Sequence, residues 1–206
     1  MRDSPPDTDF LLDRAAANDA AARDALLARH RPRLRRMVAL RLDPRVAARV
    51  DPSDVVQDVL AEADRRLDAY LQRRPLPFYP WLRQFAADQL AELHRRHVRA
   101  ARRSVGREVP GGLPDQSADE LAGRLVAKGP GPSEAARWSE RRDRVRAILL
   151  AMSAADREVL TLRYLEELTA AEVGAVLGVT AMAAQKRALR ALERLRAALG
   201  QEEGGP

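Results

Sequence analysis

The stretch TAAEVGAVLGVTAMAAQKRALRALERLRAAL, residues 169–199, predicts two helices joined by a tight turn. Thr169 is suited to cap the first helix, and Glu172, three residues later, completes a capping box. Gly178 supplies the left-handed residue that a sharp helix exit requires, and Thr180 is suited to cap the second helix. The stretch therefore predicts a helical hairpin with a short turn.

The second of these helices has two different faces. One side is apolar, because four residues recur at steps of three and four: Ala188, Leu192, Leu195 and Leu199. At about 100° per residue, the basic residues lie opposite this stripe or beside it: Lys186, Arg187, Arg190 and Arg194. This is the helix-turn-helix plan, whose second helix fits the major groove of DNA. The simplest alternative is an ordinary helical hairpin with a solvated charged face.

The composition favours an all-α fold class. The chain has 206 residues, of which 46% are hydrophobic and only 4% aromatic, and Ala and Leu dominate. The net charge of +6 suits a polyanionic partner. All but two of the 36 basic residues are Arg, the exceptions being Lys128 and Lys186, so part of the Arg content reflects a GC-rich genome. The positions of the Arg residues are therefore more informative than their number.

Several classes of function are disfavoured. The absence of Cys excludes a disulfide framework, a Cys-based zinc site and a thiol nucleophile. His94 and His97 have a metal-compatible spacing but lack a carboxylate motif, so we expect no metal and no other cofactor. With no nucleophile–base pair and no phosphate-binding Gly loop, we expect no enzyme. No signal core or membrane span is found, and a cytoplasmic location is expected.

Changes in composition divide the chain into parts. We expect a disordered N-terminus over residues 1–8 and a helical domain over 9–103, in which a new helix starts at Pro32. Pro and Gly punctuate residues 104–132, which predicts a flexible linker with one short helix near 117–126. A second helical domain over 133–200 contains a helix from Ser153 that leads directly into the helix-turn-helix. Residues 201–206 form a frayed tail.

The first domain contains a helix with an exposed acidic side. The run Asp51-Pro52-Ser53-Asp54 is a strong helix start, and the helix is expected to reach about residue 71. Its buried stripe consists of Val56, Leu60, Ala63 and Leu67. Asp54 and Asp58 point away from that stripe, and Gln57 lies at its border, so we expect an exposed acidic patch with Val55 and Val59 nearby.

A long helix from Trp81 to about Arg103 has a strongly basic second half, with Arg95, Arg96 and Arg99. Three aromatic residues lie at or just before its start: Phe78, Tyr79 and Trp81. Aromatic rings beside a row of cations suit unstacked bases and their phosphates. A solvated basic face is the alternative interpretation.

Three segments together resemble the sigma factors of bacterial RNA polymerase of the extracytoplasmic-function type, within the sigma-70 family. DPSDVVQDVL (51–60) is similar to the family's core-polymerase-binding helix, and PFYPWLRQFAADQLAELHRR (77–96) to its minus-10 region. Residues 156–196 are similar to region 4, which reads the minus-35 element. The helix AAQKRALRALERLR (183–196) is in addition similar to planctomycete members.

The resemblance implies a role for individual residues. Asp54, Gln57 and Asp58 match the motif D-x-x-Q-[DE], which would meet the β′ clamp helices, where carboxylates can pair with Arg. Trp81 matches a family Trp that is a packing residue rather than a base reader. Minus-10 DNA would be bound by Asp88, Gln89, Arg95, Arg96 and Arg99, and minus-35 DNA by Thr180, Lys186, Arg187 and Arg190.

Two departures from the family pattern affect the promoter preference. Asp88 stands where the family often has Asn, and Met182-Ala183-Ala184 where the recognition helix often reads G-T-V. The resemblance implies binding without bond chemistry, with core RNA polymerase (β′ clamp helices and β flap) and promoter DNA as partners. It leaves open an anti-sigma factor. Two alternatives remain: a dimeric helix-turn-helix regulator that binds duplex DNA without polymerase, and a helical protein-binding adaptor.

Overall fold

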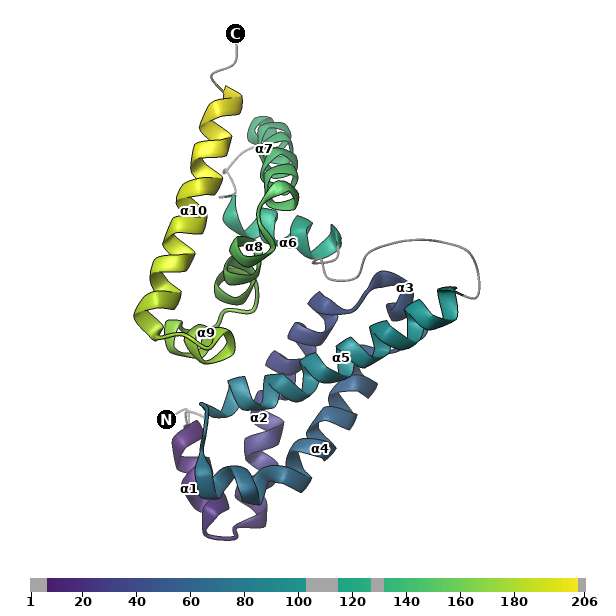
Figure 1. The fold of residues 1–206 in the computed structure, drawn as a ribbon, viewed down its shortest axis with the longest axis vertical. Helices are drawn as coiled ribbons and strands as arrows, with labels where there is room; N and C mark the ends of the chain where they lie inside the picture. The colour runs from purple at the N-terminus through teal and green to yellow at the C-terminus, as the bar shows by residue number, and fades with distance from the viewer. Residues whose placement is uncertain (1–6, 103–114, 127–131, 204–206) are drawn as a thin grey trace. The chain divides into compact units, whose positions relative to one another are not determined.

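The computed structural model describes residues 7–102, 115–126 and 132–203, and all regular structure in these ranges is helical. This confirms the predicted all-α fold class. The chain divides into two compact units, residues 1–109 and 110–206, each of which is described separately (Figure 1). None of the helices in the described ranges combines the length and the apolar character needed to cross a bilayer.

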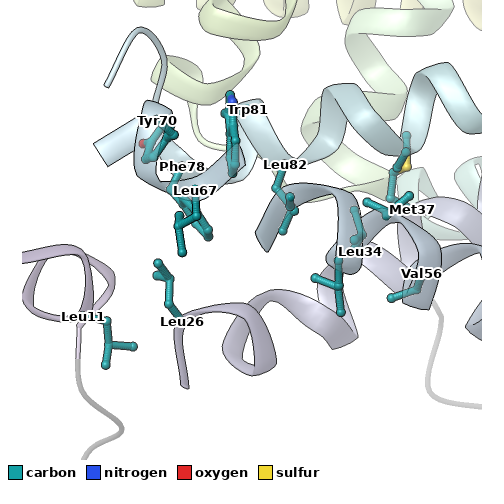
Figure 2. Packing of buried hydrophobic residues seen from close by; sticks show 14 of the residues in the cluster. Leu11, Leu26, Leu34, Met37, Val56, Leu67, Tyr70, Phe78, Trp81 and Leu82 are labelled. Carbon is teal, nitrogen blue, oxygen red and sulfur yellow. The ribbon is translucent and has the colours of Figure 1, made fainter. Parts of the chain in front are cut away.

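The N-terminal unit is built around three long helices that pack side by side, with two short helices against them (Figure 1). In chain order the helices are α1 (Thr8–Ala16), α2 (Ala20–Arg41), α3 (Pro44–Ala47), α4 (Pro52–Arg73) and α5 (Phe78–Arg102). Figure 2 shows Leu26 and Leu34 of α2, Leu67 of α4 and Leu82 of α5, all fully buried in one core. At about 1.5–3 kcal/mol for each buried Leu, this shared core holds α2, α4 and α5 together.

The expected helix start at Pro32 is wrong. Pro32 lies inside α2, which continues from Ala20 to Arg41. A proline inside a helix removes one backbone hydrogen bond and costs about 3 kcal/mol. Leu26 before Pro32 and Leu34 and Met37 after it are all fully buried in the same core, so burial offsets that cost.

The C-terminal unit contains the remaining helices, of which α9 and α10 meet at a sharp turn (Figure 1). They are α6 (Asp115–Leu125), α7 (Pro132–Ala151), α8 (Ala154–Leu160), the π-helical turn η1 (Thr161–Leu165), α9 (Ala170–Leu177) and α10 (Ala181–Glu203). The longest helix of this unit is α10, which packs against α7, α8 and α9. The core of this unit includes Leu149, Leu160, Leu162, Leu165 and Leu168, all fully buried.

Part of the expected linker belongs to the C-terminal unit. Helix α6 lies near the predicted position, but it packs against α7 and η1 and buries Ala118, Leu121 and Ala122. Two ion pairs reinforce this packing: Arg142–Asp119 to α7, and Arg124–Glu167 to the segment after η1. Residues 115–126 are therefore a packed element, because their apolar side chains find partners on helices that follow in the chain.

The helix expected from Ser153 to the helix-turn-helix is interrupted. It starts as predicted, with the Ser153 hydroxyl accepting from the Asp156 N–H, but it widens into a π turn at Thr161–Leu165. The Glu166 N–H donates to the Thr161 carbonyl at 2.9 Å, which is the five-residue spacing of a π turn. Thr161 is fully buried, and its hydroxyl donates to the Arg157 carbonyl at 2.8 Å. The four consecutive residues 159–162, where α8 passes into the π turn, are all buried.

Candidate functional site

The start of α4 presents an exposed polar patch. Asp54, Gln57 and Asp58, which we call the acidic face, are all exposed on neighbouring turns of the helix. Among the residues that the structure describes, neither carboxylate has an ion-pair partner. Val55 and Val59 lie near this patch, as expected, but both are 2% exposed and belong to the core. The acidic face is therefore entirely polar.

The position of the acidic face is fixed by the cap of α4. The Asp51 carboxylate accepts a hydrogen bond from the Ser53 N–H at 2.6 Å, and Pro52 occupies the first helical turn. The hydrogen bond from Ser53 lowers the pKa of Asp51 below its ordinary value. Arg35 of α2 donates to the Ser53 hydroxyl at 3.0 Å, so the first turn of α4 is held from two sides.

A groove of about 610 Å³ lies next to the acidic face, between α4 and α5. It brings together Asp58 of the acidic face with Asp88 and Gln89 of α5, residues that the resemblance assigned to different partners. Asp88 is exposed and Gln89 half-buried. A ligand in this groove would contact side chains of both sets at once.

The groove is also lined by residues that were not among the predicted site residues, and these include Arg65, Arg66 and Phe85. The Arg66 guanidinium lies over the Phe85 ring, 5.4 Å from its centroid, and pairs with Glu62 at 2.5 Å. This combination of a ring and a cation is suited to a planar or anionic group. The spacing of Glu62 and Arg66 indicates a helix-surface ion pair in the sequence, but the approach of Phe85 depends on how α4 packs on α5.

The aromatic residues at the start of α5 are core residues. Phe78, Tyr79 and Trp81 are 3%, 2% and 8% exposed, so the expectation that they offer stacking surfaces for bases is wrong. Trp81 and Tyr70 belong to the same cluster (Figure 2), and their ring centroids lie 4.4 Å apart. The Tyr70 hydroxyl donates to the Leu76 carbonyl at 3.0 Å. The structure confirms Trp81 as a packing residue.

The basic half of α5 contains a local carboxylate. Arg95 and Arg96 are both exposed, and each donates to the Glu92 carboxylate at 2.8 Å. These hydrogen bonds, from Arg95 first and then Arg96, lower the pKa of Glu92. Arg99 lies within α5, but its side chain is outside the described part of the chain, as is that of His97. Among the described residues, no group of three His, Cys, Asp or Glu could hold a metal ion.

The helix-turn-helix forms as the sequence predicts. The Thr169 N–H donates to the Glu172 carboxylate at 2.8 Å, and the Glu172 N–H donates to the Thr169 hydroxyl at 3.2 Å, which completes the capping box. Gly178 ends α9 with a φ of +65°. The Thr180 hydroxyl accepts from the Ala183 N–H at 3.2 Å and so caps α10. These caps fix the point where α10 leaves the turn.

One face of α10 is basic and exposed. Ala184, Ala188, Ala191 and Leu195 are buried against the unit, whereas Lys186, Arg187 and Arg190 are exposed. None of these three cations has a partner within the described residues. Arg194 differs, because it pairs with Asp156 of α8 at 2.5 Å and thereby ties α10 to the unit. The unpaired cations are therefore concentrated in the first half of α10.

Two helical units, one with a capped helix-turn-helix and a basic second helix, define a class of helical DNA-binding protein. Residues 148–197 match the family described as Sigma-70, region 4. The RNA polymerase sigma factor CnrH of Cupriavidus metallidurans is 31% identical over 198 residues, covering 95% of this chain and 96% of the relative. A solved structure, "Structure of CnrH in complex with the cytosolic domain of CnrY", shares the fold, with a TM-score of 0.53 at 23% identity over 95% of this chain and 99% of that chain.

The chain belongs to the RNA polymerase sigma factors, as an extracytoplasmic-function type member of the sigma-70 family. It therefore binds core RNA polymerase and DNA and directs promoter-specific transcription initiation, and the family is non-enzymatic. The similarity to CnrH extends over both units of the chain. The alternative of a helix-turn-helix regulator accounts only for the C-terminal unit, so it does not explain this similarity. The comparisons give no support for the expected likeness to planctomycete members.

Proposed function

We propose that the acidic face of α4 binds core polymerase, at the β′ clamp helices. The observation that carries this proposal is the exposure of Asp54 and Asp58, which lack ion-pair partners among the described residues, on a helix start fixed by Asp51. Exposed carboxylates accept paired hydrogen bonds from Arg, and Gln57 adds a donor and an acceptor. The face is thus suited to a basic helical partner.

Charge reversal tests this assignment. The double variant Asp54→Arg, Asp58→Arg should abolish binding to purified core polymerase in a pull-down, because each side chain would then repel the basic partner. The double variant Asp24→Arg, Asp143→Arg is the matched control, since both residues are exposed and the change in net charge is equal. Circular dichroism should show unchanged helicity for both. Full binding by the first variant would refute the assignment.

We propose that minus-10 DNA is bound along α5 by Asp88, Gln89, Arg95, Arg96 and Arg99. Asp88 and Gln89 line the groove beside α4, and Arg95 and Arg96 are exposed further along the same helix. Promoter phosphates would compete with Glu92 for the two guanidinium groups, because both are strong acceptors for Arg. The buried Phe78, Tyr79 and Trp81 have no stacking role in this proposal.

We propose that minus-35 DNA is bound by α10, through Thr180, Lys186, Arg187 and Arg190. Thr180 caps the helix N-terminus, where phosphate binding is favoured, and the three cations are exposed and unpaired within the described residues. The double variant Lys186→Ala, Arg190→Ala should weaken the upstream footprint of the holoenzyme. It should also reduce the slope of log affinity against log salt by about 0.9 for each lost phosphate contact. An unaltered footprint would show that the recognition helix is misassigned.

We further propose two protein partners: the β flap of core polymerase for the C-terminal unit, and an anti-sigma factor for the chain. The family resemblance implies the β flap of core polymerase as a partner of the C-terminal unit. CnrH was solved with the cytosolic domain of CnrY, which supports an anti-sigma factor as a regulatory partner of this chain as well. A sigma factor acts where RNA polymerase is, so we propose a cytoplasmic location, which cell fractionation would test.

A further inference from the structure

Two exposed apolar side chains interrupt the basic face of α10. Among the described residues, three large hydrophobic side chains are exposed: Phe10 at 53%, Met182 at 67% and Leu189 at 52%. Two of these lie on α10, and both are in its first half, beside the unpaired cations. Exposing Met and Leu in water has no benefit for the isolated unit, so a partner that covers them would gain by their burial.

The geometry of the helix places these two residues in one line. Met182 and Leu189 are seven residues apart, which is about two turns, so they lie on the same side of α10 and about 10 Å apart along its axis. Lys186 and Gln185 lie between them, and Arg190 follows. This line lies about 100–160° around the helix from the buried Ala184, Ala188 and Leu195, beside Lys186, so it is on the exposed side of α10.

The chemistry of this line selects its partner. The flanking cations favour a polyanion, and α10 is the second helix of a helix-turn-helix, the element that enters the major groove. The apolar feature of that groove is the C5-methyl group of thymine, which apolar side chains contact, whereas Gln pairs with N6 and N7 of adenine. Met182, Gln185 and Leu189 are thus all suited to A·T base pairs.

We propose that Met182 and Leu189 contact thymine methyl groups in the upstream promoter element. Each A·T pair presents one C5-methyl group in the major groove, so two such contacts require two A·T pairs. We therefore expect the upstream element to contain at least two A·T pairs within reach of α10. This inference rests on the proposed function of α10 in minus-35 binding, and it adds which bases that helix selects.

Replacing thymine with uracil removes only the methyl group and tests the inference directly. The promoter is first mapped by transcription with the holoenzyme, and its upstream element is then synthesised with deoxyuridine in place of every thymidine. The affinity of the wild-type holoenzyme should fall about fourfold for each contacted methyl group that is removed. The double variant Met182→Ala, Leu189→Ala should bind the normal promoter more weakly and show no further loss on the deoxyuridine promoter.

Controls separate this inference from the proposed function. Phe10→Ala removes the third exposed hydrophobic side chain and should behave as wild type on both promoters. Equal wild-type affinity for both promoters, or a mapped upstream element without A·T pairs, would overturn the inference. The inference would also be overturned if the Met182→Ala, Leu189→Ala variant still bound the deoxyuridine promoter more weakly than the normal promoter. Loss of core polymerase binding by that variant would overturn it as well. If the inference is overturned but the Lys186→Ala, Arg190→Ala variant weakens the upstream footprint, α10 still binds minus-35 DNA and only the thymine contacts are refuted. If that variant leaves the footprint unchanged, the proposed role of α10 in minus-35 binding is itself refuted.

Discussion

Gly178 at the end of α9 and Gly174 within it have different physical requirements. Gly178 has a φ of +65°, a conformation that disfavours any residue with a Cβ, but nothing lies within 4 Å of a Cβ added there. Gly174 is limited by space instead, because an added Cβ would lie 2.7 Å from the Val179 carbonyl oxygen and 3.1 Å from the Ala181 N atom. The first glycine sets the direction of the chain, and the second allows α9 to approach the start of α10.

Alanine substitutions should separate these requirements. Gly178→Ala should destabilise the C-terminal unit by about 1–2 kcal/mol through backbone strain alone. Gly174→Ala should cost about 1–3 kcal/mol, because the clash is with backbone atoms that cannot rotate away. Gly200→Ala, in an open position near the end of α10, is the control and should not destabilise the unit. Chemical denaturation measures all three, and unchanged stability for Gly174→Ala would contradict the close approach.

The start of α4 is the element on which the proposed polymerase contact depends. Its cap, Asp51, has a pKa below its ordinary value because the carboxylate accepts the Ser53 N–H. The folded pKa is thus lower than the unfolded one, so the stabilisation is present above the unfolded pKa and is lost as the pH falls through the folded pKa.

This sign gives a pH-dependent prediction. At neutral pH, Asp51→Ala should lower the melting temperature, because the N–H groups of the first turn lose their acceptor. The difference from wild type should shrink as the pH falls below about 4, where the wild-type carboxylate becomes protonated. Thermal melts followed by circular dichroism at a series of pH values measure this. A difference that is constant down to pH 2 would mean that the cap is not ionic.

How well each element could be predicted depends on how local its causes are. The helix-turn-helix was predictable because its caps, Thr169 and Thr180, and its turn residue, Gly178, act within a few residues. The continuity of α2 through Pro32 was not, because it results from burial against other helices. The groove beside Asp58 was not predictable either, since Asp88 reaches it only when α4 and α5 pack together. The exposed positions of the proposed site residues follow from helical periodicity, and their proposed roles follow from the family resemblance.

The C-terminal unit begins earlier in the chain than its composition predicts. The Pro- and Gly-rich composition of residues 104–132 predicts a linker, yet α6 within it is packed on α7 and η1. Leu121 is fully buried, which composition alone does not reveal. The domain start expected at residue 133 would therefore remove part of the core.

Two fragments test this boundary. A fragment of residues 110–206 should unfold cooperatively, whereas a fragment of residues 133–206 should be markedly less stable, because it lacks α6. In the longer fragment, Leu121→Ala should cost about 2–5 kcal/mol, as expected for a fully buried Leu. Denaturation followed by circular dichroism compares them. Equal stability of the two fragments would show that α6 contributes nothing to the unit.

We propose that this chain directs RNA polymerase to promoters through the acidic face of α4 and the basic face of α10. Transcription in vitro with purified core polymerase and a pool of genomic promoters, with the wild-type chain or the Asp54→Arg, Asp58→Arg variant, tests this. We expect new transcripts from defined start sites with the wild type and none with the variant. Equal transcription with both, or no new start sites with the wild type although it binds core polymerase, would contradict this account.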